Sequence, residues 1–174
     1  PKLHQYQKQA ITLACQRTAL TFALPMGSGK SLCALEVTRI RNAFPCLIVC
    51  PASLRFNWVE EIARWQPSRK VSVLAGANFN LSPDYNVVSY AQAKRVLGTG
   101  AEFAQLICDE AHYLKNAKSA RAKAVFGATK RSVGLRHLSR FQLYLTGTPI
   151  LNCPYEAYNL LRACGMPMGR EEYA

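Results

Sequence analysis

The sequence predicts an α/β domain of three layers, in which a mostly parallel central sheet lies between two layers of helices. Apolar runs of strand length alternate with stretches of helical spacing, an order typical of parallel sheets. The run CLIVC at 46–50 is apolar throughout, as in a strand covered on both faces. The chain has 174 residues, of which 49% are hydrophobic, and this suits one core and one domain.

Each element follows from apolar spacing and from the residues that stop helices and strands. Pro25 and Pro51 end two of the strands, because proline cannot donate to a sheet ladder. Ser53 is expected to cap the helix that follows it, with Glu60 and Glu61 on the outer side of that helix. Helices are predicted at residues 3–16, 30–41, 53–65, 91–97, 117–128 and 155–163. Strands are predicted at 18–24, 46–50, 71–74, 86–89, 104–108 and 142–145.

Basic residues outnumber acidic ones by 22 to 10, which gives a formal net charge of +12. A field of this sign attracts polyanions, and the phosphates of nucleic acids are the commonest of these. The basic residues are scattered, unlike the run of a disordered tail. Charge alone leaves two readings open, a nucleic-acid partner and a basic surface without a ligand.

The seven cysteines form no C-x-x-C pair, which excludes a zinc site or a disulfide framework of ordinary spacing. Cys46 and Cys50 flank the most apolar run and are expected to be buried thiols. This usage predicts a reducing, intracellular compartment. No apolar run approaches the roughly 18 residues that cross a bilayer, and the start does not resemble a signal peptide, so no membrane partner is expected. Because Pro1 is not methionine, the chain is expected to be a piece of a longer protein.

The segment MGSGKS at 26–31 joins a predicted strand to a predicted helix and indicates a phosphate-binding loop. Glycines let successive N–H groups point at phosphate oxygens, and the helix start adds its positive end. Lys30 is expected to reach the β and γ phosphates, and the Ser31 hydroxyl to ligate Mg²⁺. The full Walker A pattern has glycine where this chain has Leu24, which leaves an ordinary glycine turn as the alternative. The candidates for nucleotide contact here are Met26, Gly27, Ser28, Gly29, Lys30 and Ser31.

An acidic pair follows the apolar strand that ends at Cys108. Asp109 is expected to hold the water shell of Mg²⁺, and Glu110 to orient and deprotonate the attacking water. The alternative is an acidic cap for the next helix. With Lys30, this pair makes up the predicted catalytic set.

The segment TGTP at 146–149 follows a third apolar strand. The hydroxyls of Thr146 and Thr148 could sense the γ-phosphate, although a plain turn is the alternative. All three segments begin where a predicted strand stops. Because parallel strands meet ligands at their carboxyl ends, the sequence predicts that they converge on one nucleotide.

These strings, in this order, resemble superfamily-two helicases and, in detail, the Swi/Snf family of DNA translocases. LHQYQKQAI at 3–11 resembles the family's adenine-contacting motif, and ALPMGSGKS at 23–31 its phosphate loop. LIVCPASLRFNWVEEIARW at 47–65 is similar to its segment beside the DNA path. DEAHYLKNAKSARAKA at 109–124 and LTGTPILN at 145–152 are the most specific matches. The chain departs from the family at Leu24 and Pro25, where acids are usual. Its compact spacing resembles phage, bacterial or annealing-helicase members.

The resemblance implies a RecA-like P-loop domain over 1–174, the first lobe of a two-lobed motor that uses ATP and Mg²⁺ to translocate on double-stranded DNA. Gln7 would contact adenine. His112, Thr146 and Thr148 would couple nucleotide state to DNA grip. The implied DNA contacts are Ser53, Arg55, Lys115 and Asn116. Their alternative reading is a solvated basic face and a capped loop.

The resemblance also bears on what lies outside the chain. Only 22 residues follow LTGTPILN, too few for the family's second lobe with its arginine fingers, which is expected in cis. The isolated chain is therefore expected to hydrolyse ATP poorly. The protein is expected to be a monomer, in the cytoplasm or nucleoid of a prokaryote or virus, or in the nucleus of a eukaryote.

Two other functions stay open. One is another superfamily-two motor, such as a restriction translocase or an RNA helicase, although RNA helicases usually carry Ser-Ala-Thr where this chain has Thr-Gly-Thr. The other is a non-catalytic basic domain that binds nucleic acid, against which the intact Lys30, Asp109 and Glu110 argue. A metabolic kinase is disfavoured because no segment suggests a small acceptor site.

Overall fold

A computed structural model describes residues 3–76, 79–82, 84–129, 131–147 and 158–165. Its centre is a six-stranded parallel sheet in the order β1-β6-β5-β2-β4-β3. The strands are β1 Ala19–Ala23, β2 Cys46–Cys50, β3 Val71–Leu74, β4 Tyr85–Ser89, β5 Phe103–Cys108 and β6 Ser139–Thr146. The α-helices are α1 Gln5–Cys15, α2 Lys30–Arg41, α3 Arg55–Trp65, α4 Ala93–Gly98, α5 Ala120–Phe126 and α6 Tyr158–Ala163. Short 3₁₀ turns are η1 Ala52–Leu54, η2 Tyr90–Gln92, η3 Ala111–Leu114 and η4 Leu135–Leu138.

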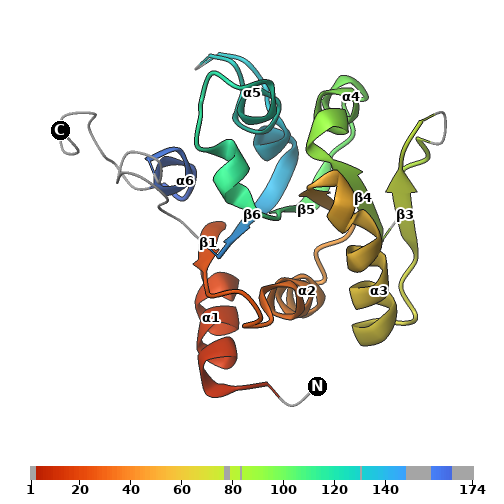
Figure 1. Cartoon of the computed structure of the whole chain (residues 1–174), viewed down its shortest axis with the longest axis vertical. Coiled ribbons are helices and arrows are strands. Elements are labelled where there is room, and N and C mark those ends of the chain that lie inside the picture. The colour runs from red at the N-terminus through yellow and green to blue at the C-terminus, as the bar shows by residue number, and fades with distance from the viewer. Residues whose placement is uncertain (1–2, 77–78, 83, 130, 148–157, 166–174) are drawn as a thin grey trace.

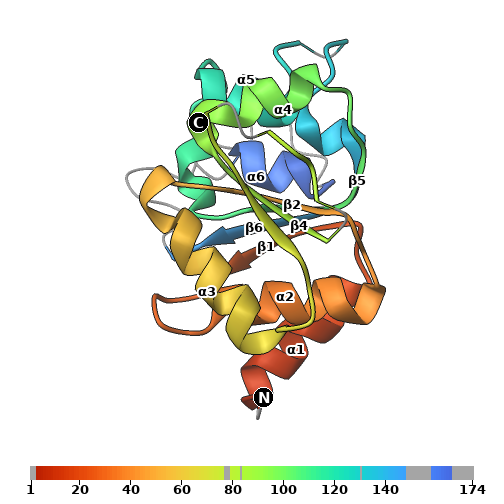
Figure 2. The same ribbon diagram turned by 90° about the vertical axis from the view of Figure 1, so that its right-hand side faces the viewer.

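Helices cover both faces of the sheet, which confirms the predicted three-layer α/β class. Figure 1 shows α1, α2 and α3 on one side and α4, α5 and α6 on the other. The turned view in Figure 2 keeps the same separation. Each face buries its own apolar cluster, one against α1–α3 and one against α4–α6. Among the described helices, none has the length and hydropathy that a membrane span requires.

Strand β2 lies inside the sheet and contributes to both clusters. Its five residues are fully buried, with Cys46 and Ile48 in one cluster and Leu47 in the other. This confirms the predicted strand covered on both faces and the buried thiols at Cys46 and Cys50. Burial raises the pKa of the Cys50 thiol to about 12. The six cysteines among the described residues are free thiols.

Two predictions about helix starts differ from the structure. Ser53 was expected to cap α3, but it lies inside the 3₁₀ turn η1, and α3 begins at Arg55 without a side-chain cap. Pro51 starts this turn, which replaces the cap. The basic helix predicted at 117–128 is shorter, because Ser119 accepts a hydrogen bond from the Ala122 N–H and begins α5 there. Residues 155–157 of the last predicted helix lie outside the described residues.

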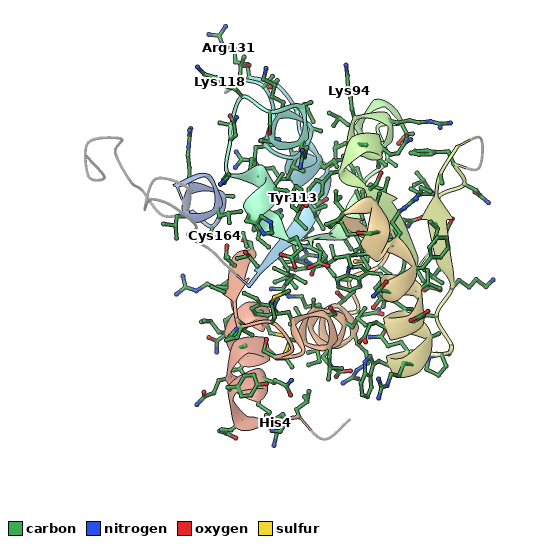
Figure 3. The ribbon with its side chains drawn as sticks, in the orientation of Figure 1. His4, Lys94, Tyr113, Lys118, Arg131 and Cys164 are labelled. Carbon is green, nitrogen blue, oxygen red and sulfur yellow. The ribbon has the colours of Figure 1, made fainter. Side chains whose placement is uncertain are left out.

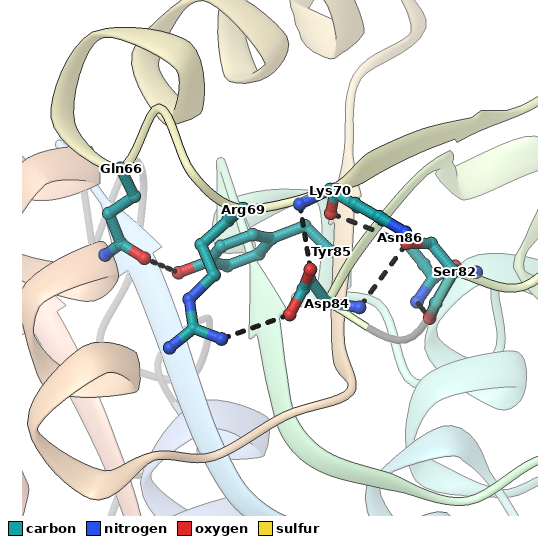
Figure 4. Close-up of polar contacts among 7 residues, drawn as sticks. All are labelled: Gln66, Arg69, Lys70, Ser82, Asp84, Tyr85 and Asn86. Atoms are coloured by element: carbon teal, nitrogen blue, oxygen red, sulfur yellow. Dashed lines mark hydrogen bonds and ion pairs between the residues drawn. The ribbon is translucent and has the colours of Figure 1, made fainter.

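A polar network fixes the edge strand β3 to β4 (Figure 4). Asp84 accepts hydrogen bonds from the Arg69 guanidinium and the Lys70 N–H, at 3.2 Å and 2.8 Å. The buried Tyr85 hydroxyl donates to Gln66 at 2.9 Å, and Gln66 donates in turn to the Leu35 carbonyl on α2. These bonds tie the end of α3 to the sheet, and α3 forms one wall of the site described next.

Candidate nucleotide site

Three chain segments that are distant in sequence meet at the carboxyl edge of the sheet. Strand β6 lies between β1 and β5, with Ala23 opposite Thr146 and Tyr144 opposite Cys108. The glycine loop after β1 and the acidic pair after β5 face each other across a cavity of about 380 Å³. The cavity is lined by Met26, Gly27, Gly29, Lys30, Ser31, Leu54, Asn57, Trp58, Glu61, Asp109 and Glu110. The predicted convergence of the loop with the acidic pair is therefore present.

The glycine loop adopts a conformation that only glycine enters without strain. Gly27 and Gly29 have φ angles of 75° and 78°, in the left-handed region. A Cβ at Gly29 would lie 2.6 Å from Nε2 of Gln7. Gln7 is 5% exposed, and its amide donates to the Ser28 carbonyl at 2.9 Å. Gln7 thus holds the loop against α1, while Tyr6 donates to the same carbonyl at 2.9 Å.

Lys30 lies at the meeting point of the loop and the turn after β6. Its Nζ donates to the carbonyl oxygens of Leu24 and Pro25, both at 3.0 Å. A Cβ added to Gly147 would be 3.7 Å from that Nζ and 3.3 Å from Cγ of Met26. The turn after β6 therefore packs directly on the glycine loop, and Gly147 permits the close approach.

Asp109 is held from two sides at the end of β5. Its Oδ2 accepts from the Trp58 indole at 2.9 Å, and its Oδ1 accepts from the Glu110 N–H at 2.9 Å. The Tyr90 hydroxyl donates to the Asp109 main-chain carbonyl at 2.8 Å. Burial raises the pKa of the Asp109 carboxyl above its usual value, while the Trp58 and Glu110 donors and the charge of Lys30 oppose that rise. Asp109 as a whole is 8% exposed and lines the cavity.

Glu110 and His112 form a second polar pair beside Asp109. Glu110 has a φ of 48°, a strained region for a residue with a side chain and one that recurs at functional sites. Glu110 directly precedes η3. Nδ1 of His112 lies 3.1 Å from Oε2 of Glu110. This bend turns Glu110 away from the line of β5.

Of the predicted coupling residues, His112 lies beside the cavity, at a neighbouring hollow. His112 and Gly147 line a hollow of about 290 Å³ that shares Met26, Leu54 and Glu110 with the first. Thr146 is fully buried at the end of β6. Thr148 lies outside the described residues.

The predicted DNA contacts occupy two places on this edge. Ser53 is exposed and lines the second hollow and a further one of about 570 Å³ beside Tyr90, Lys94 and Arg121. Arg55 donates to the Ala52 carbonyl at 3.1 Å. Lys115 is half-buried and makes contacts of its own.

Asn116 and Tyr113 lie in the segment that follows the acidic pair. The Asn116 side-chain oxygen accepts from the Lys118 N–H at 2.9 Å, and its main-chain carbonyl accepts from the Ser119 hydroxyl at 2.7 Å. Tyr113 lines both outer hollows and stacks on Tyr90 at 5.8 Å. Figure 3 shows Tyr113 near the sheet, whereas Lys94, Lys118 and Arg131 point outward on the α4–α5 side.

The sequence did not predict that α3 and the preceding turn η1 form one wall of the cavity. Leu54, Asn57, Trp58 and Glu61 line the cavity, so Glu61 does not lie on the outer side of the helix as expected. Glu60 is exposed, as predicted. The period of α3 could have placed Trp58 and Glu61 on one face, but no local signal relates that face to the acidic pair.

The cavity suits a nucleotide with a hydrated magnesium ion. Among the described residues, no three His, Cys, Asp or Glu side chains gather as a protein-only metal site. Mg²⁺ in nucleotide sites commonly takes one or two protein oxygens and relies on phosphates and water for the rest. Ser31 and Asp109 both line the cavity with Lys30, so this donor set fits such an ion.

A model of the SNF2-related domain family matches residues 3–168. The chain is 32% identical over 168 residues to the SWI/SNF-related matrix-associated actin-dependent regulator of chromatin subfamily A-like protein 1 of Xenopus tropicalis, covering 92% of this chain and 17% of that protein. It is 30% identical to the human DNA annealing helicase and endonuclease ZRANB3, covering 93% of this chain and 16% of that one. The chain thus spans about a sixth of these relatives.

A solved structure has the same architecture. The SWI2/SNF2 ATPase core of Sulfolobus solfataricus, in complex with double-stranded DNA, superposes with a TM-score of 0.80 at 25% identity. The match covers 94% of this chain and 36% of that one.

Proposed function

The chain belongs to the SNF2-related domain family, and we propose that it is the ATP-binding and magnesium-binding lobe of a motor that translocates on double-stranded DNA. The observation that carries the proposal is the single cavity lined by Lys30, Ser31, Asp109 and Glu110. Its neighbours Gln7 and Gly147 brace the glycine loop. A loop held in this way suits phosphates better than an apolar ligand.

In the proposed reaction each residue acts through its own chemistry. Lys30 binds the β and γ phosphates from the base of the cavity, and Glu110 orients water and accepts its proton. Ser31 and Asp109 would hold the magnesium ion, which neutralises phosphate charge when bound. Met26, Gly27, Ser28 and Gly29 shape the loop, and Gln7 adds an adenine contact. His112, Thr146 and Thr148 transmit the nucleotide state.

The proposed DNA partner rests on charge and on the relatives. The Sulfolobus core was solved with double-stranded DNA, and the net charge of this chain is +12. Ser53, Arg55, Lys115 and Asn116 are the proposed contacts, and of these Ser53 lines both outer hollows. A second lobe in cis would close the cleft and supply the arginines that accelerate hydrolysis by about 10³–10⁵.

A nucleotide titration tests the proposal. The 174-residue chain should bind fluorescent ATP with Mg²⁺, and Lys30→Ala should weaken that binding at least about tenfold, because a charge-assisted contact contributes about 1.5–3 kcal/mol. Lys8→Ala, on the exposed side of α1, is the matched control. Equal binding by the Lys30→Ala and Lys8→Ala chains would contradict the proposal.

ATPase stimulation of the full protein separates the neighbouring functions. Stimulation by duplex DNA is expected, whereas stimulation by RNA alone would favour an RNA helicase. Biological activity unchanged by Lys30→Ala would favour a non-catalytic domain that binds nucleic acid.

A further inference from the structure

Trp58 is a buried tryptophan whose polar atom faces the acidic end of β5. Its side chain is 2% exposed and belongs to the apolar cluster beneath α1–α3. An indole N–H can only donate, and a buried donor without a partner costs free energy. The partner here is Oδ2 of Asp109 at 2.9 Å. The ring therefore packs in the core, while its N–H meets the carboxylate of Asp109 at the wall of the nucleotide cavity.

Asp109 needs such a restraint. The terminal torsion of an aspartate side chain is broad, so packing alone does not fix the plane of its carboxylate. A carboxylate offers about four acceptor sites. Trp58 occupies one on Oδ2, and the Glu110 N–H occupies one on Oδ1. The remaining sites, about two, are left for water or a cation at the cavity wall.

We propose that Trp58 is a positioning residue for magnesium, whose indole N–H fixes the Asp109 carboxylate in the orientation that holds the hydrated ion. This inference rests on the proposed nucleotide function and adds a residue to it. Side chains that hydrogen-bond a metal ligand typically alter metal affinity by about 10–100-fold when they are removed. Trp58 makes such a hydrogen bond to Asp109, a proposed magnesium ligand.

The same helix offers a matched control. Trp65 lies two turns beyond Trp58 on α3 and donates its indole N–H to Oε2 of Glu61 at 2.8 Å. Both are tryptophans whose N–H meets a carboxylate, and they are the only two in the chain. Trp58 alone of the pair contacts Asp109. Substitution by phenylalanine removes the donor and keeps an aromatic ring in each case.

The experiment measures fluorescent ATP binding to the full chain while Mg²⁺ is titrated, and again in EDTA. Trp58→Phe should raise the Mg²⁺ concentration at half-saturation at least about tenfold, while nucleotide affinity in EDTA stays within about twofold. Trp65→Phe should leave the Mg²⁺ concentration at half-saturation unchanged, because Glu61 is not one of the proposed magnesium ligands. If Trp58→Phe does not fold, judged by circular dichroism and thermal unfolding, benzothienylalanine at position 58 replaces the N–H with sulfur in a ring of the same shape.

The outcomes separate this inference from the function on which it rests. If the unsubstituted chain binds no nucleotide, the proposed function fails and this inference with it. If that chain binds and the variant at position 58 needs no more Mg²⁺ than Trp65→Phe, the positioning role alone is wrong. If the variant at position 58 loses as much nucleotide affinity in EDTA as with Mg²⁺, the positioning role is also wrong, because the loss would then come from packing alone.

Discussion

At the scale of single residues, the glycine loop depends on one contact that lies outside it. Gln7 comes from α1, yet its amide holds the Ser28 carbonyl at 2.9 Å and lies where a Cβ of Gly29 would be. The two glycines of the loop have nearly the same φ, but a Cβ on Gly27 would meet nothing within 4 Å. A side chain at Gly27 would therefore meet backbone strain alone, whereas one at Gly29 would also displace the Gln7 amide.

Gly29→Ala is expected to lower the free energy of unfolding by about 2 kcal/mol or more, measured by urea denaturation. Gly27→Ala should lower it by about 1 kcal/mol, since only the left-handed backbone is penalised. In a Gln7→Ala background the two substitutions should cost the same, because no amide is left to displace. Equal costs in the unsubstituted chain would show that Gln7 does not limit the loop.

The buried thiol of Cys50 predicts how stability depends on pH. Its pKa is raised from 9.0 to about 12 in the folded chain, so the folded state holds its proton where the unfolded state releases it. The stabilisation is complete below pH 9 and is lost as the pH rises from 9 towards 12.

At pH 10 this loss amounts to about 1.4 kcal/mol for one such thiol. Urea unfolding at pH 7 and pH 10 should therefore show a smaller pH dependence in Cys50→Ala, by about that amount. Val49→Ala leaves a cavity in the same strand without removing a titrating group, and its pH dependence should match that of the unsubstituted chain. If Cys50→Ala loses as much free energy of unfolding between pH 7 and pH 10 as Val49→Ala does, the Cys50 thiol is not the group that causes the pH dependence.

At the scale of elements, strands were easier to predict than the starts of helices. The apolar run of β2 marks its own bounds, because both faces of this strand are covered and all five positions are buried. Strand β5 begins one residue before its predicted start and includes the buried Gln105. Ser53 and Ser119 both resemble caps in sequence, yet only Ser119 makes the cap bond. A proline two residues before Ser53 leads the chain into a 3₁₀ turn instead, and no local pattern reveals that choice.

Ser119→Ala should therefore destabilise the chain by about 1 kcal/mol, the usual effect of losing a cap. Ser53→Ala should stay within about 0.5 kcal/mol, as for an ordinary surface position. Thermal or urea unfolding of the two variants checks the difference. The reverse order would mean that α3 depends on Ser53 after all.

At the scale of the whole molecule, the predicted site depends on the sheet order. The glycine loop and the acidic pair could be predicted from their local sequence, since both follow apolar strands. The sequence could not identify Trp58, Glu61 or Tyr90, because their relation to Asp109 exists only after α3 and η2 pack against β5. Contacts across elements carry no local signature.

The net charge of +12 predicts duplex DNA binding that weakens steeply with salt. Log affinity should fall linearly with log salt, with a slope near −0.9 for each neutralised phosphate. Arg55→Ala should reduce the steepness by about one unit. Arg39→Ala, whose side chain pairs with Glu36 at 2.9 Å on α2, should leave the slope unchanged. Equal slopes for both variants would remove Arg55 from the proposed DNA contacts.

We propose that the glycine loop and the acidic pair, which line one cavity, bind one triphosphate and its metal. Crystals grown with Mn²⁺ and a non-hydrolysable ATP analogue test it most directly, because manganese scatters anomalously. We expect one strong anomalous peak between Ser31 and Asp109, with the γ-phosphate beside Lys30. A nucleotide bound elsewhere, or manganese away from Asp109, would contradict the claim.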